Sequence, residues 1–505
     1  MTVTQLEHVV VFPAFYWGHI RPMCTLVARM AKLRPIVITF LPFASLHDRV
    51  KAELPRDFQP GEEGVASRIR VVALQDGTEE YHSSGAPGAL KAAWQRIVEQ
   101  QPLTCAKTDE QLEALLTPRA ALIDFFAPEA YEAVREISGH QLKVYSWYPC
   151  ATNSIFRLLG KDLSPGDNGT ATPNNDGSQN DTEIIGAING SIVRSPCLPP
   201  MYDYELHPQA YMHSAELINK LIVKIPGVLA TTDGFVTIDA ADFQPKATAE
   251  VRKALAETSR RMFYAGPLLP SGQQAVRGEK QQSQNGNEIM AFLDEKLAIC
   301  GERSVVYISF GSLFWPSDPE KIWAVLEVLM ERNLPFVMSH AAEFAGPVPE
   351  KVKDMVAGYG NGIISDWVPQ QALLEHPATG WYLMHGGHNG TLEAIMAGVP
   401  MIVWPITADQ PLNAVYLTDE ANVAYELVEV RHGIGLGKIY RNGVTPTGTI
   451  DAVKDEMRGV LEKAFGEDGA EKRAKLQVLR KKLQAAWEEE GVARREVEAF
   501  LDSIL

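Results

Sequence analysis

The chain has 505 residues, of which 46% are hydrophobic and 22% are charged, and its formal net charge at pH 7 is −16. This length and composition are typical of a globular protein with two or three domains that bury hydrophobic cores. The acidic balance argues against nucleic acid as a partner, because a surface that follows a phosphate backbone needs an excess of Lys and Arg. An anionic ligand would therefore be held by a local arrangement, such as the start of a helix.

Neither export nor membrane insertion is indicated by the sequence. The five cysteines are scattered without a Cys-x-x-Cys pair, which is typical of reduced thiols in a cytosolic protein. The first apolar run follows no basic region, which favours a buried strand over a signal peptide. Since no run of about 18 apolar residues occurs, we expect no transmembrane segment and a cytoplasmic protein. We also expect a monomer.

Short runs rich in Val and Ile alternate with helical patterns, which predicts parallel sheets covered by helices on both faces. The first series of candidate strands comprises His8–Phe12, Pro35–Phe40, Arg68–Ala73, Ala120–Phe125, Leu142–Trp147 and Gly227–Thr232. The second series comprises Ser304–Phe310, Pro335–Ser339, Gly362–Asp366, Gly380–Met384 and Pro400–Trp404. Two such series predict an α/β protein with two doubly wound, Rossmann-like parallel-sheet domains.

Two polar stretches suggest how the domains are divided. The stretch 267–287 is rich in Gln and Gly, and we interpret it as the linker between an N-terminal domain (1–266) and a C-terminal domain (288–480). A second stretch, about 161–183, is rich in Gly, Asn, Asp and Ser and is interpreted as a mobile insertion in the first domain. Residues 481–505 are predicted to form a C-terminal helix that packs back on the N-terminal domain.

A glycine-rich turn follows one of the predicted strands of the second series. It reads HGGHNG from His385 to Gly390 and leads into a helical pattern, with Asn389 as the candidate N-cap. Such a turn brings backbone N–H groups close to an anion, and the helix dipole favours negative charge. Because this turn and the pair Asp409-Gln410 both follow strands, they lie where open α/β sheets bind ligands. These residues alone indicate an anion site of a kind that many folds possess.

Structural interpretations of the same residues stay open at this stage. Trp367 and Trp404 could be ordinary core residues, and Glu393 could be a solvated helix carboxylate. His385 and His388, three residues apart, could pair on a metal ion. No third ligand of suitable spacing accompanies them, so we expect no metal.

From Trp367 to Gln410 the sequence resembles, without a gap, the nucleotide-sugar signature of the UDP-dependent glycosyltransferase family, best known from plant secondary-product enzymes. The matching landmarks are Trp367, Pro369-Gln370, Leu374, His376, Gly380, His385, Gly387, Asn389, Leu392-Glu393, Gly398-Val399-Pro400, Trp404-Pro405 and Asp409-Gln410. The resemblance implies a GT-B fold, in which two Rossmann-like domains face each other across a cleft. It also implies a UDP-sugar donor as co-substrate, with no cofactor and no metal required.

The resemblance assigns the uridine to the first part of this signature. Trp367 would stack on the uracil, with Val368 and Gln370 nearby. Glu393 would accept hydrogen bonds from the ribose hydroxyls.

The diphosphate and the sugar are assigned to the later part. The diphosphate would be held by His385, Asn389 and the amides of the glycine turn, helped by Ser312. Asp409 and Gln410 would form hydrogen bonds with the sugar hydroxyls. A Gln at the last position of the signature, here Gln410, favours glucose over galactose.

Two positions depart from the plant pattern, which usually reads His-Cys-Gly-Trp-Asn-Ser at this turn. Gly390 lacks the serine hydroxyl, and its backbone N–H is expected to replace that donor to the phosphate. His388 stands in place of Trp and leaves the identity of the sugar open. These departures favour a fungal or bacterial member of the family. The candidate donor-binding residues at the turn are His385, Gly387, His388, Asn389 and Gly390.

A candidate catalytic pair lies in the N-terminal half. His19 follows the first strand, ahead of a helix predicted over Met23–Lys32, within a Gly-His-x-x-Pro sequence. This sequence resembles the family element whose histidine is the general base. Asp124 ends the strand in LIDFF and would fix the imidazole tautomer and stabilise the imidazolium. From the residues alone, a helix-capping role for His19 and a strand-end cap role for Asp124 stay open.

The resemblance implies a direct displacement on a UDP-α-sugar. An acceptor hydroxyl, deprotonated by His19, would attack the anomeric carbon from the face opposite UDP and give a β-glycoside by inversion. Aromatic residues near the base and at other strand ends favour a hydrophobic phenolic, terpenoid or lipid-like acceptor, although such residues are equally common in cores. The candidate pocket residues are Phe15, Tyr16, Trp17, Phe125, Phe126, Trp147 and Tyr148.

Other functions remain as alternatives on the sequence alone. One is a UDP-sugar-binding regulatory protein that keeps the fold without turnover, although it would not need both His19 and Asp124. Another is a nucleotide-sugar epimerase or a glycogen-type phosphorylase on the same two-domain architecture. Glycoside hydrolysis requires paired carboxylates, and the sequence shows no obvious acid pair at the cleft.

Overall fold

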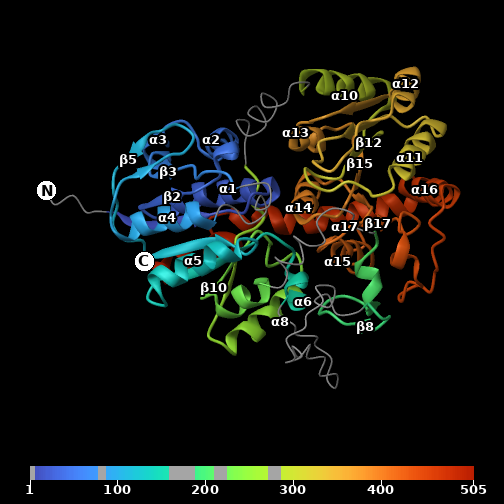
Figure 1. The fold of residues 1–505 in the computed structure, drawn as a ribbon. Helices are drawn as coiled ribbons and strands as arrows, with labels where there is room; N and C mark the ends of the chain where they lie inside the picture. The colour runs from blue at the N-terminus through green and yellow to red at the C-terminus, as the bar shows by residue number, and fades with distance from the viewer. Residues whose placement is uncertain (1–5, 78–86, 159–187, 210–223, 271–285) are drawn as a thin grey trace. The chain divides into compact units, whose positions relative to one another are not determined.

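Two parallel β-sheets organise the chain, one in each of its two compact units (Figure 1). The structure is a computed structural model and describes residues 6–77, 87–158, 188–209, 224–270 and 286–505. Unit 1 comprises Met1–Gly160, Glu216–Gly278 and Ala485–Leu505, and unit 2 comprises Lys161–Ala215 and Glu279–Gln484.

The described part of unit 1 contains a seven-stranded parallel sheet. Its strands are β1 (Glu7–Phe12), β2 (Ile36–Phe40), β3 (Ile69–Val71), β6 (Ala120–Asp124), β7 (Lys143–Tyr148), β10 (Gly234–Thr237) and β11 (Met262–Tyr264). They lie in the order β11-β10-β7-β6-β1-β2-β3. The chain therefore builds the sheet outward from β1 to β3 and then returns to the other side of β1 with β6. Such a reversal is the switch point beside which doubly wound sheets bind their ligands.

The strands of unit 1 are connected and covered by helices. These are α1 (Trp17–Leu33), α2 (His47–Glu53), α3 (Glu63–Ala66), α4 (Pro87–Val98), α5 (Pro128–Ser138), α6 (Ile155–Leu158), α8 (Pro245–Ala256) and α18 (Val492–Ile504). A short antiparallel pair, β4 (Leu103–Thr104) with β5 (Gln111–Leu112), lies outside the main sheet.

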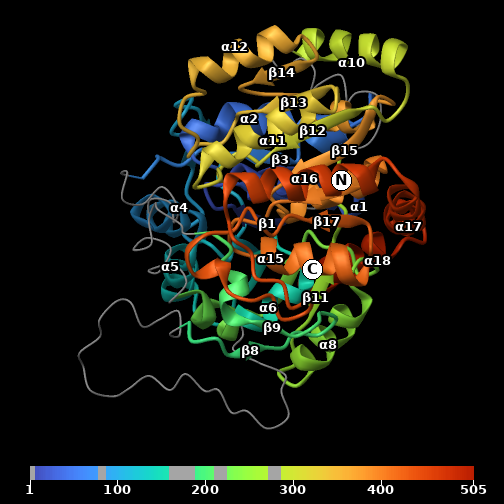
Figure 2. The same ribbon diagram turned by 90° about the vertical axis from the view of Figure 1, so that its right-hand side faces the viewer.

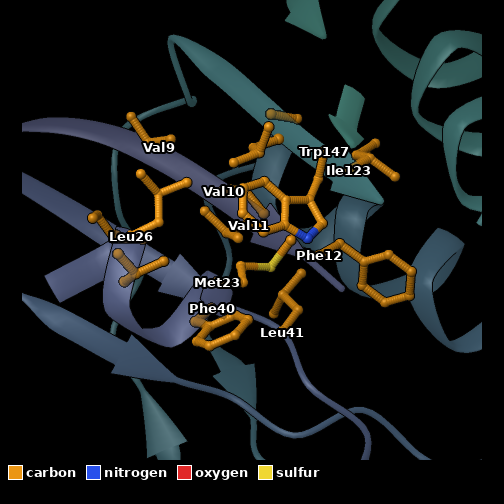
Figure 3. Packing of buried hydrophobic residues seen from close by; sticks show 14 of the residues in the cluster. Val9, Val10, Val11, Phe12, Met23, Leu26, Phe40, Leu41, Ile123 and Trp147 are labelled. Carbon is orange, nitrogen blue, oxygen red and sulfur yellow. The ribbon is translucent and has the colours of Figure 1, made fainter. Parts of the chain in front are cut away.

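The core of unit 1 is centred on β1, where Val9, Val10, Val11 and Phe12 are all buried. Figure 3 shows how side chains of α1 and of the neighbouring strands gather around them. A strand buried on both faces has no polar side to alternate with, which explains its continuous apolar run. Trp147 is fully buried in the same cluster.

The last helix, α18, belongs to the core of unit 1. Phe500 packs edge-on against Tyr145 of β7, with ring centroids 5.0 Å apart, and the Tyr145 hydroxyl lies 3.2 Å from Ser503 Oγ. The residues preceding α18 also belong to unit 1, since Trp487 Nε1 donates to the Ala265 carbonyl over 2.9 Å. The sequence prediction placed residues 481–505 on the N-terminal domain, whereas unit 1 takes the chain only from Ala485 and residues 481–484 group with unit 2.

A buried histidine in β1 makes unit 1 sensitive to acid. His8 Nδ1 donates to the Leu116 carbonyl and Nε2 contacts the Thr39 hydroxyl, both over 2.8 Å. Burial lowers the pKa of His8 to about 4, from an ordinary value near ~6.5 in the unfolded chain. Because the unfolded state then binds more protons between these values, stability falls as the pH drops from ~6.5 towards ~4.

We therefore expect His8 to cost about 2 kcal/mol of unfolding free energy when the pH is lowered from ~7 to ~5. Differential scanning calorimetry of the wild type and His8→Gln measures this, because the variant lacks the titrating group and loses less stability over the same interval. The exposed His140 offers a matched control, since His140→Gln keeps the wild-type pH dependence. Parallel losses in the wild type and His8→Gln would contradict the assignment.

The described part of unit 2 contains a six-stranded parallel sheet. Its strands are β12 (Val305–Ser309), β13 (Phe336–Ser339), β14 (Gly362–Ser365), β15 (Thr379–Met384), β16 (Met401–Val403) and β17 (Ala424–Glu426). Their order, β14-β13-β12-β15-β16-β17, repeats the doubly wound plan of unit 1. The switch point here lies between β12 and β15.

Helices cover this second sheet as well. They are α10 (Gly286–Cys300), α11 (Pro319–Glu331), α12 (Glu350–Tyr359), α13 (Gln370–Glu375), α14 (His388–Ala397), α15 (Gln410–Val415), α16 (Ile450–Ala464) and α17 (Glu467–Gln484). Helices α11 and α16 pack side by side, as Figure 2 shows. None of the helices in the described ranges combines the length and the apolar character needed to span a membrane.

The structure corrects the predicted domain boundary. Residues 188–209, which the sequence placed in the N-terminal domain, group with unit 2. They contain a small antiparallel pair, β8 (Ile192–Val193) with β9 (Met201–Tyr202). The predicted insertion near 161–183 and most of the predicted linker lie outside the described residues.

One predicted strand is wrong. Residues 227–231 of Gly227–Thr232 lie in a helical segment, 224–231, and the strand β10 follows it. Ile225, Val228 and Leu229 are buried, and their spacing of three and four residues is that of one helix face. The strands β11 and β17 were not predicted. Each has only three residues and lies at a sheet edge, and such short strands have little periodic signal, although the equally short β3 was predicted within Arg68–Ala73.

Candidate active site

The candidate catalytic residues lie at the switch point of the unit 1 sheet. Phe12 at the end of β1 is the register partner of Ile123 in the neighbouring strand β6, so Asp124 lies one residue beyond. The helix α1 begins at Trp17, earlier than the sequence predicted, and its first turn contains His19. The two side chains therefore come from adjacent parallel strands that end at the same edge of the sheet.

His19 and Asp124 form a hydrogen-bonded pair. His19 Nδ1 lies 2.9 Å from Asp124 Oδ2. The other carboxylate oxygen accepts from the Phe126 backbone N–H over 2.9 Å, which fixes the orientation of the carboxylate. Because the Asp124 carboxylate can only accept, Nδ1 carries the hydrogen and the lone pair is on Nε2. The pair has the arrangement of a base whose tautomer is set by a buried acid.

The surroundings of this pair divide the predicted acceptor residues into two groups. Phe126 and Tyr16 are half-buried, with ring centroids 5.0 Å and 5.5 Å from the His19 ring. Trp147, by contrast, is fully buried, and its Nε1 donates to the His19 carbonyl over 3.2 Å. Trp147 therefore packs in the core and holds the backbone at His19, and it does not line a pocket.

The remaining aromatic residues of the prediction are also assigned by their burial. Phe125 and Tyr148 are core residues, at 1% and 0% exposure. Phe15 and Trp17 are half-buried against the core, and the guanidinium of Arg49 lies 3.9 Å from the centre of the Trp17 ring. Among the seven predicted residues, those with accessible ring surface beside His19 are thus Tyr16 and Phe126.

The predicted diphosphate residues lie at the switch point of the unit 2 sheet. Ser309 of β12 and Met384 of β15 are register partners, so Ser312 and His385 both follow at the same edge. The turn after β15 leads directly into α14, whose N-cap is Gly387. The Gly387 carbonyl accepts from the backbone N–H and the hydroxyl of Thr391, each over 3.1 Å.

The predicted N-cap at Asn389 is therefore wrong. Asn389 is the second residue of α14, and the extended backbone of Gly387, with φ −63° and ψ 142°, takes the capping position. His388, the first residue of the helix, is buried at 3% exposure. The first-turn N–H groups of a helix have no intrahelical acceptors and bind anions readily. The first turn at His388–Gly390 is such a helix start.

The imidazole of His385 lies between two glycines. A Cβ atom built on Gly387 would lie 2.4 Å from His385 Nε2, and one on Gly311 would lie 3.0 Å from His385 Cε1. Gly311 also has a φ of +81°, which side chains disfavour. Burial lowers the pKa of His385 to about 4, so the ring is neutral near pH 7. It can donate one hydrogen bond to an anion without carrying charge itself.

The predicted uridine residues Gln370 and Glu393 are in contact. Gln370 Nε2 donates to Glu393 Oε2, and Gln370 Oε1 accepts from the hydroxyls of Tyr307 and Tyr382 over 2.8 Å and 3.2 Å. The two phenols are stacked across neighbouring strands, with centroids 4.6 Å apart. Glu393 is only 4% exposed, which excludes the solvated carboxylate considered on the sequence alone.

The tryptophans of the signature have different environments. Trp367 follows β14 and is 36% exposed, so part of its side chain is accessible to solvent. Trp404 is 1% exposed and packs edge-on against Phe310, with centroids 5.5 Å apart. Trp404 is thus a core residue, and Val368 beside Trp367 is also buried.

Asp409, one of the two predicted sugar-binding residues, is held by a residue that the sequence did not single out. Asn413 Nδ2 donates to Asp409 Oδ2 over 3.0 Å and to the Gly386 carbonyl over 2.9 Å. Gln410 Oε1 accepts from the N–H groups of Ile406 and Thr407 over 3.0 Å and 3.1 Å. Asn413, one helical turn after Asp409, therefore links Asp409 to the glycine turn. In the sequence, only the spacing of four residues between Asp409 and Asn413 could have indicated this contact, because side chains four residues apart are neighbours on a helix.

The chain is similar to several known proteins. A family model described as "UDP-glucoronosyl and UDP-glucosyl transferase" matches residues 239–431. The chain is similar to UDP-glycosyltransferase eriJ of Hericium erinaceus, with 29% identity over 99% of both chains. It is also similar to a flavonol 3-O-glucosyltransferase of Arabidopsis thaliana, with 26% identity over 99% of this chain and 98% of the relative.

A transferase of Siraitia grosvenorii solved in complex with UDP has a similar fold, with a TM-score of 0.70 and 17% identity over 99% of both chains. The GT-B fold expected from the sequence is confirmed, since the two doubly wound sheets are present and the match extends over nearly the whole chain.

Proposed function

Since the chain belongs to the UDP-glycosyltransferase family, we propose that it transfers glucose from UDP-glucose to a hydroxyl of a hydrophobic small molecule, with inversion. The observation that carries the proposal is the hydrogen bond between His19 Nδ1 and Asp124 Oδ2. It leaves the basic Nε2 of His19 to take a proton. A regulatory protein without turnover would not require this pair.

The proposed step forms one bond and breaks one. The acceptor oxygen bonds to the anomeric carbon as its proton passes to His19 Nε2, and the bond from that carbon to the β-phosphate oxygen breaks, releasing UDP. The imidazolium is stabilised by the buried Asp124 carboxylate. Attack opposite the leaving group turns a UDP-α-sugar into a β-glycoside.

The donor is assigned to the carboxyl edge of the unit 2 sheet. The N-terminus of α14 and the neutral His385 would stabilise the negative charge that develops on the leaving diphosphate, which requires no resident metal. Glu393, held by Gln370, would accept from the ribose hydroxyls. Because Gln410 Oε1 already binds loop amides, its amide NH₂ is the group that would donate to a sugar hydroxyl.

The acceptor class rests on the aromatic surface beside the base. Tyr16 and Phe126 flank His19, and flat apolar rings favour a phenolic or terpenoid acceptor. The relative from Arabidopsis thaliana acts, by its name, on a flavonol. We further propose a monomeric cytoplasmic protein, for which the free thiols of its cysteines are suitable. Light scattering during gel filtration tests the oligomeric state.

The test is release of UDP from UDP-glucose in the presence of a panel of phenols and terpenoid alcohols, with products identified by mass spectrometry. We expect a mass increase of one hexose on at least one acceptor, a β-linkage by NMR coupling, and activity that survives EDTA. UDP-galactose serves as the matched donor. An epimeric UDP-sugar formed without acceptor, or failure to bind UDP by calorimetry, would overturn the proposal.

A further inference from the structure

The segment 188–209 contacts the loops that surround the proposed donor site, although in sequence it lies between two strands of the unit 1 sheet. Its end is tied to unit 2 through the backbone, where His432 N–H donates to the Pro208 carbonyl over 3.0 Å. Earlier in the segment, the Tyr204 hydroxyl donates to the Lys438 carbonyl over 2.7 Å. The last described residue of the segment is Gln209.

Gln209 joins two loops with a single side chain. Its Nε2 donates to the Pro405 carbonyl over 3.1 Å, and its Oε1 accepts from both the backbone N–H and the hydroxyl of Ser317, each over 3.1 Å. The side-chain amide cannot be reversed, because a carbonyl can only accept and a backbone N–H can only donate. Gln209 is 5% exposed, so water does not compete freely for these bonds.

The two loops that Gln209 joins follow β12 and β16. The first, 310–318, contains Ser312, and the second, 404–409, contains Asp409 and the amides that hold Gln410. They lie on either side of the glycine turn that follows β15, since β15 is hydrogen-bonded to both β12 and β16. Loops at strand ends lack the ladder hydrogen bonds that order the strands and are the first parts of a fold to open.

We infer that Gln209 is a positioning residue for the donor site, holding both loops in their binding geometry before UDP-glucose arrives. The inference rests on the proposed function, because it assigns the donor to this edge of the sheet. Loops that are ordered in advance lose less conformational entropy when a ligand binds. Gln209 lies far in sequence from the signature residues and is outside the segment that resembles the family pattern.

The first experiment compares Gln209→Leu with the wild type. Leucine keeps the apolar volume and removes all three hydrogen bonds, so we expect the KM for UDP-glucose and the Kd for UDP to rise about 5- to 30-fold. The kcat and the acceptor KM are expected to stay within about 3-fold, because no group that would touch the acceptor or the reacting atoms is changed. A general loss of folding would instead lower the active fraction and leave the donor KM unchanged.

Hydrogen–deuterium exchange gives a second readout that separates the loops. Gln209→Leu is expected to accelerate exchange in both 310–318 and 404–409. Gln209→Glu keeps the acceptor for Ser317 and places an oxygen opposite the Pro405 carbonyl, so it should accelerate exchange in 404–409 alone. Tyr204→Phe is the matched control, since it removes an anchor of the same segment that does not contact either loop.

The outcomes distinguish this inference from the proposed function. If UDP neither binds the wild-type protein nor protects the loops, the proposed donor site is wrong. If UDP binds the wild type but Gln209→Leu has the same donor KM and the same loop exchange, the positioning role is wrong. If Tyr204→Phe weakens UDP binding as much as Gln209→Leu, the effect belongs to the whole segment and not to Gln209. Should Gln209→Leu fail to fold, Gln209→Glu carries the same test on 404–409.

Discussion

Replacing His19 by alanine is expected to lower kcat/KM by about 10²- to 10⁴-fold, which is the usual contribution of a positioned general base. The affinity for UDP should not change, because the proposed donor residues lie in unit 2. The variant tests the chemistry directly, since the imidazole is the group that would receive the acceptor proton.

The loss should depend on the acidity of the acceptor. A phenol that ionises near neutral pH needs little help from a base, whereas an aliphatic alcohol needs much. A series of substituted phenols assayed with the wild type and His19→Ala measures this, with UDP release as the readout. Asp124→Asn should also lower kcat strongly, because an amide can present an N–H to Nδ1 and stabilise the wrong tautomer.

The prediction for His19→Ala has a matched control and an outcome that would contradict it. His140→Ala, at an exposed position outside the site, is the matched control and should retain full activity. If His19→Ala keeps its activity across the phenol series, His19 is not the base. In that case its hydrogen bond with Asp124 serves the structure of the turn alone.

Replacing Gly387 by alanine should raise the KM for UDP-glucose by about 10- to 100-fold, the effect of losing one or two hydrogen bonds to a charged group. A methyl group at Gly387 would lie 2.4 Å from His385 Nε2, which is too close for a carbon–nitrogen contact, so the ring would have to shift. His385 would be displaced together with the start of α14. Calorimetry of UDP binding and steady-state kinetics both measure the loss.

Gly390→Ala is the matched control three residues away. Its Cβ would lie 3.1 Å from the Met384 methyl, which is the end of a flexible side chain and can move aside. We expect the donor KM of this variant to stay within about 3-fold of the wild type, since alanine keeps the Gly390 backbone N–H in the first turn of α14 and is favoured in helices. A donor KM of Gly387→Ala that stays within about 3-fold of the wild type would show that His385 and its turn do not hold the diphosphate.

Much of the architecture could be read from local patterns. The apolar runs of β1 and β15 are buried on both faces, so their side chains need no alternation and stand out as continuous segments. The short edge strands β11 and β17 lack this signal and were not predicted. The helical segment at 224–231 was mistaken for a strand because its apolar run is short, and length is the main criterion between the two.

The candidate site was predictable as a set of residues but not as a set of contacts. The candidate residues came from the resemblance of the Trp367–Gln410 segment and of the Gly-His-x-x-Pro sequence to motifs of the family. The residues alone indicated only an anion site where strands end. Asn413, Tyr307 and Tyr382 carry no such pattern. Their roles depend on which strands are neighbours, and the sequence does not state the strand order.

The sequence by itself determined the α/β class, the two strand series and the residues at the carboxyl ends of β1, β6 and β15, because hydrophobic periodicity and glycine turns are local properties. The tertiary structure decided that 188–209 belongs with unit 2, that Gln370 holds Glu393, and that two glycines border His385. These contacts join residues far apart in the chain. Strand order and packing determine these contacts. The residues next to each position in the sequence carry little information about them.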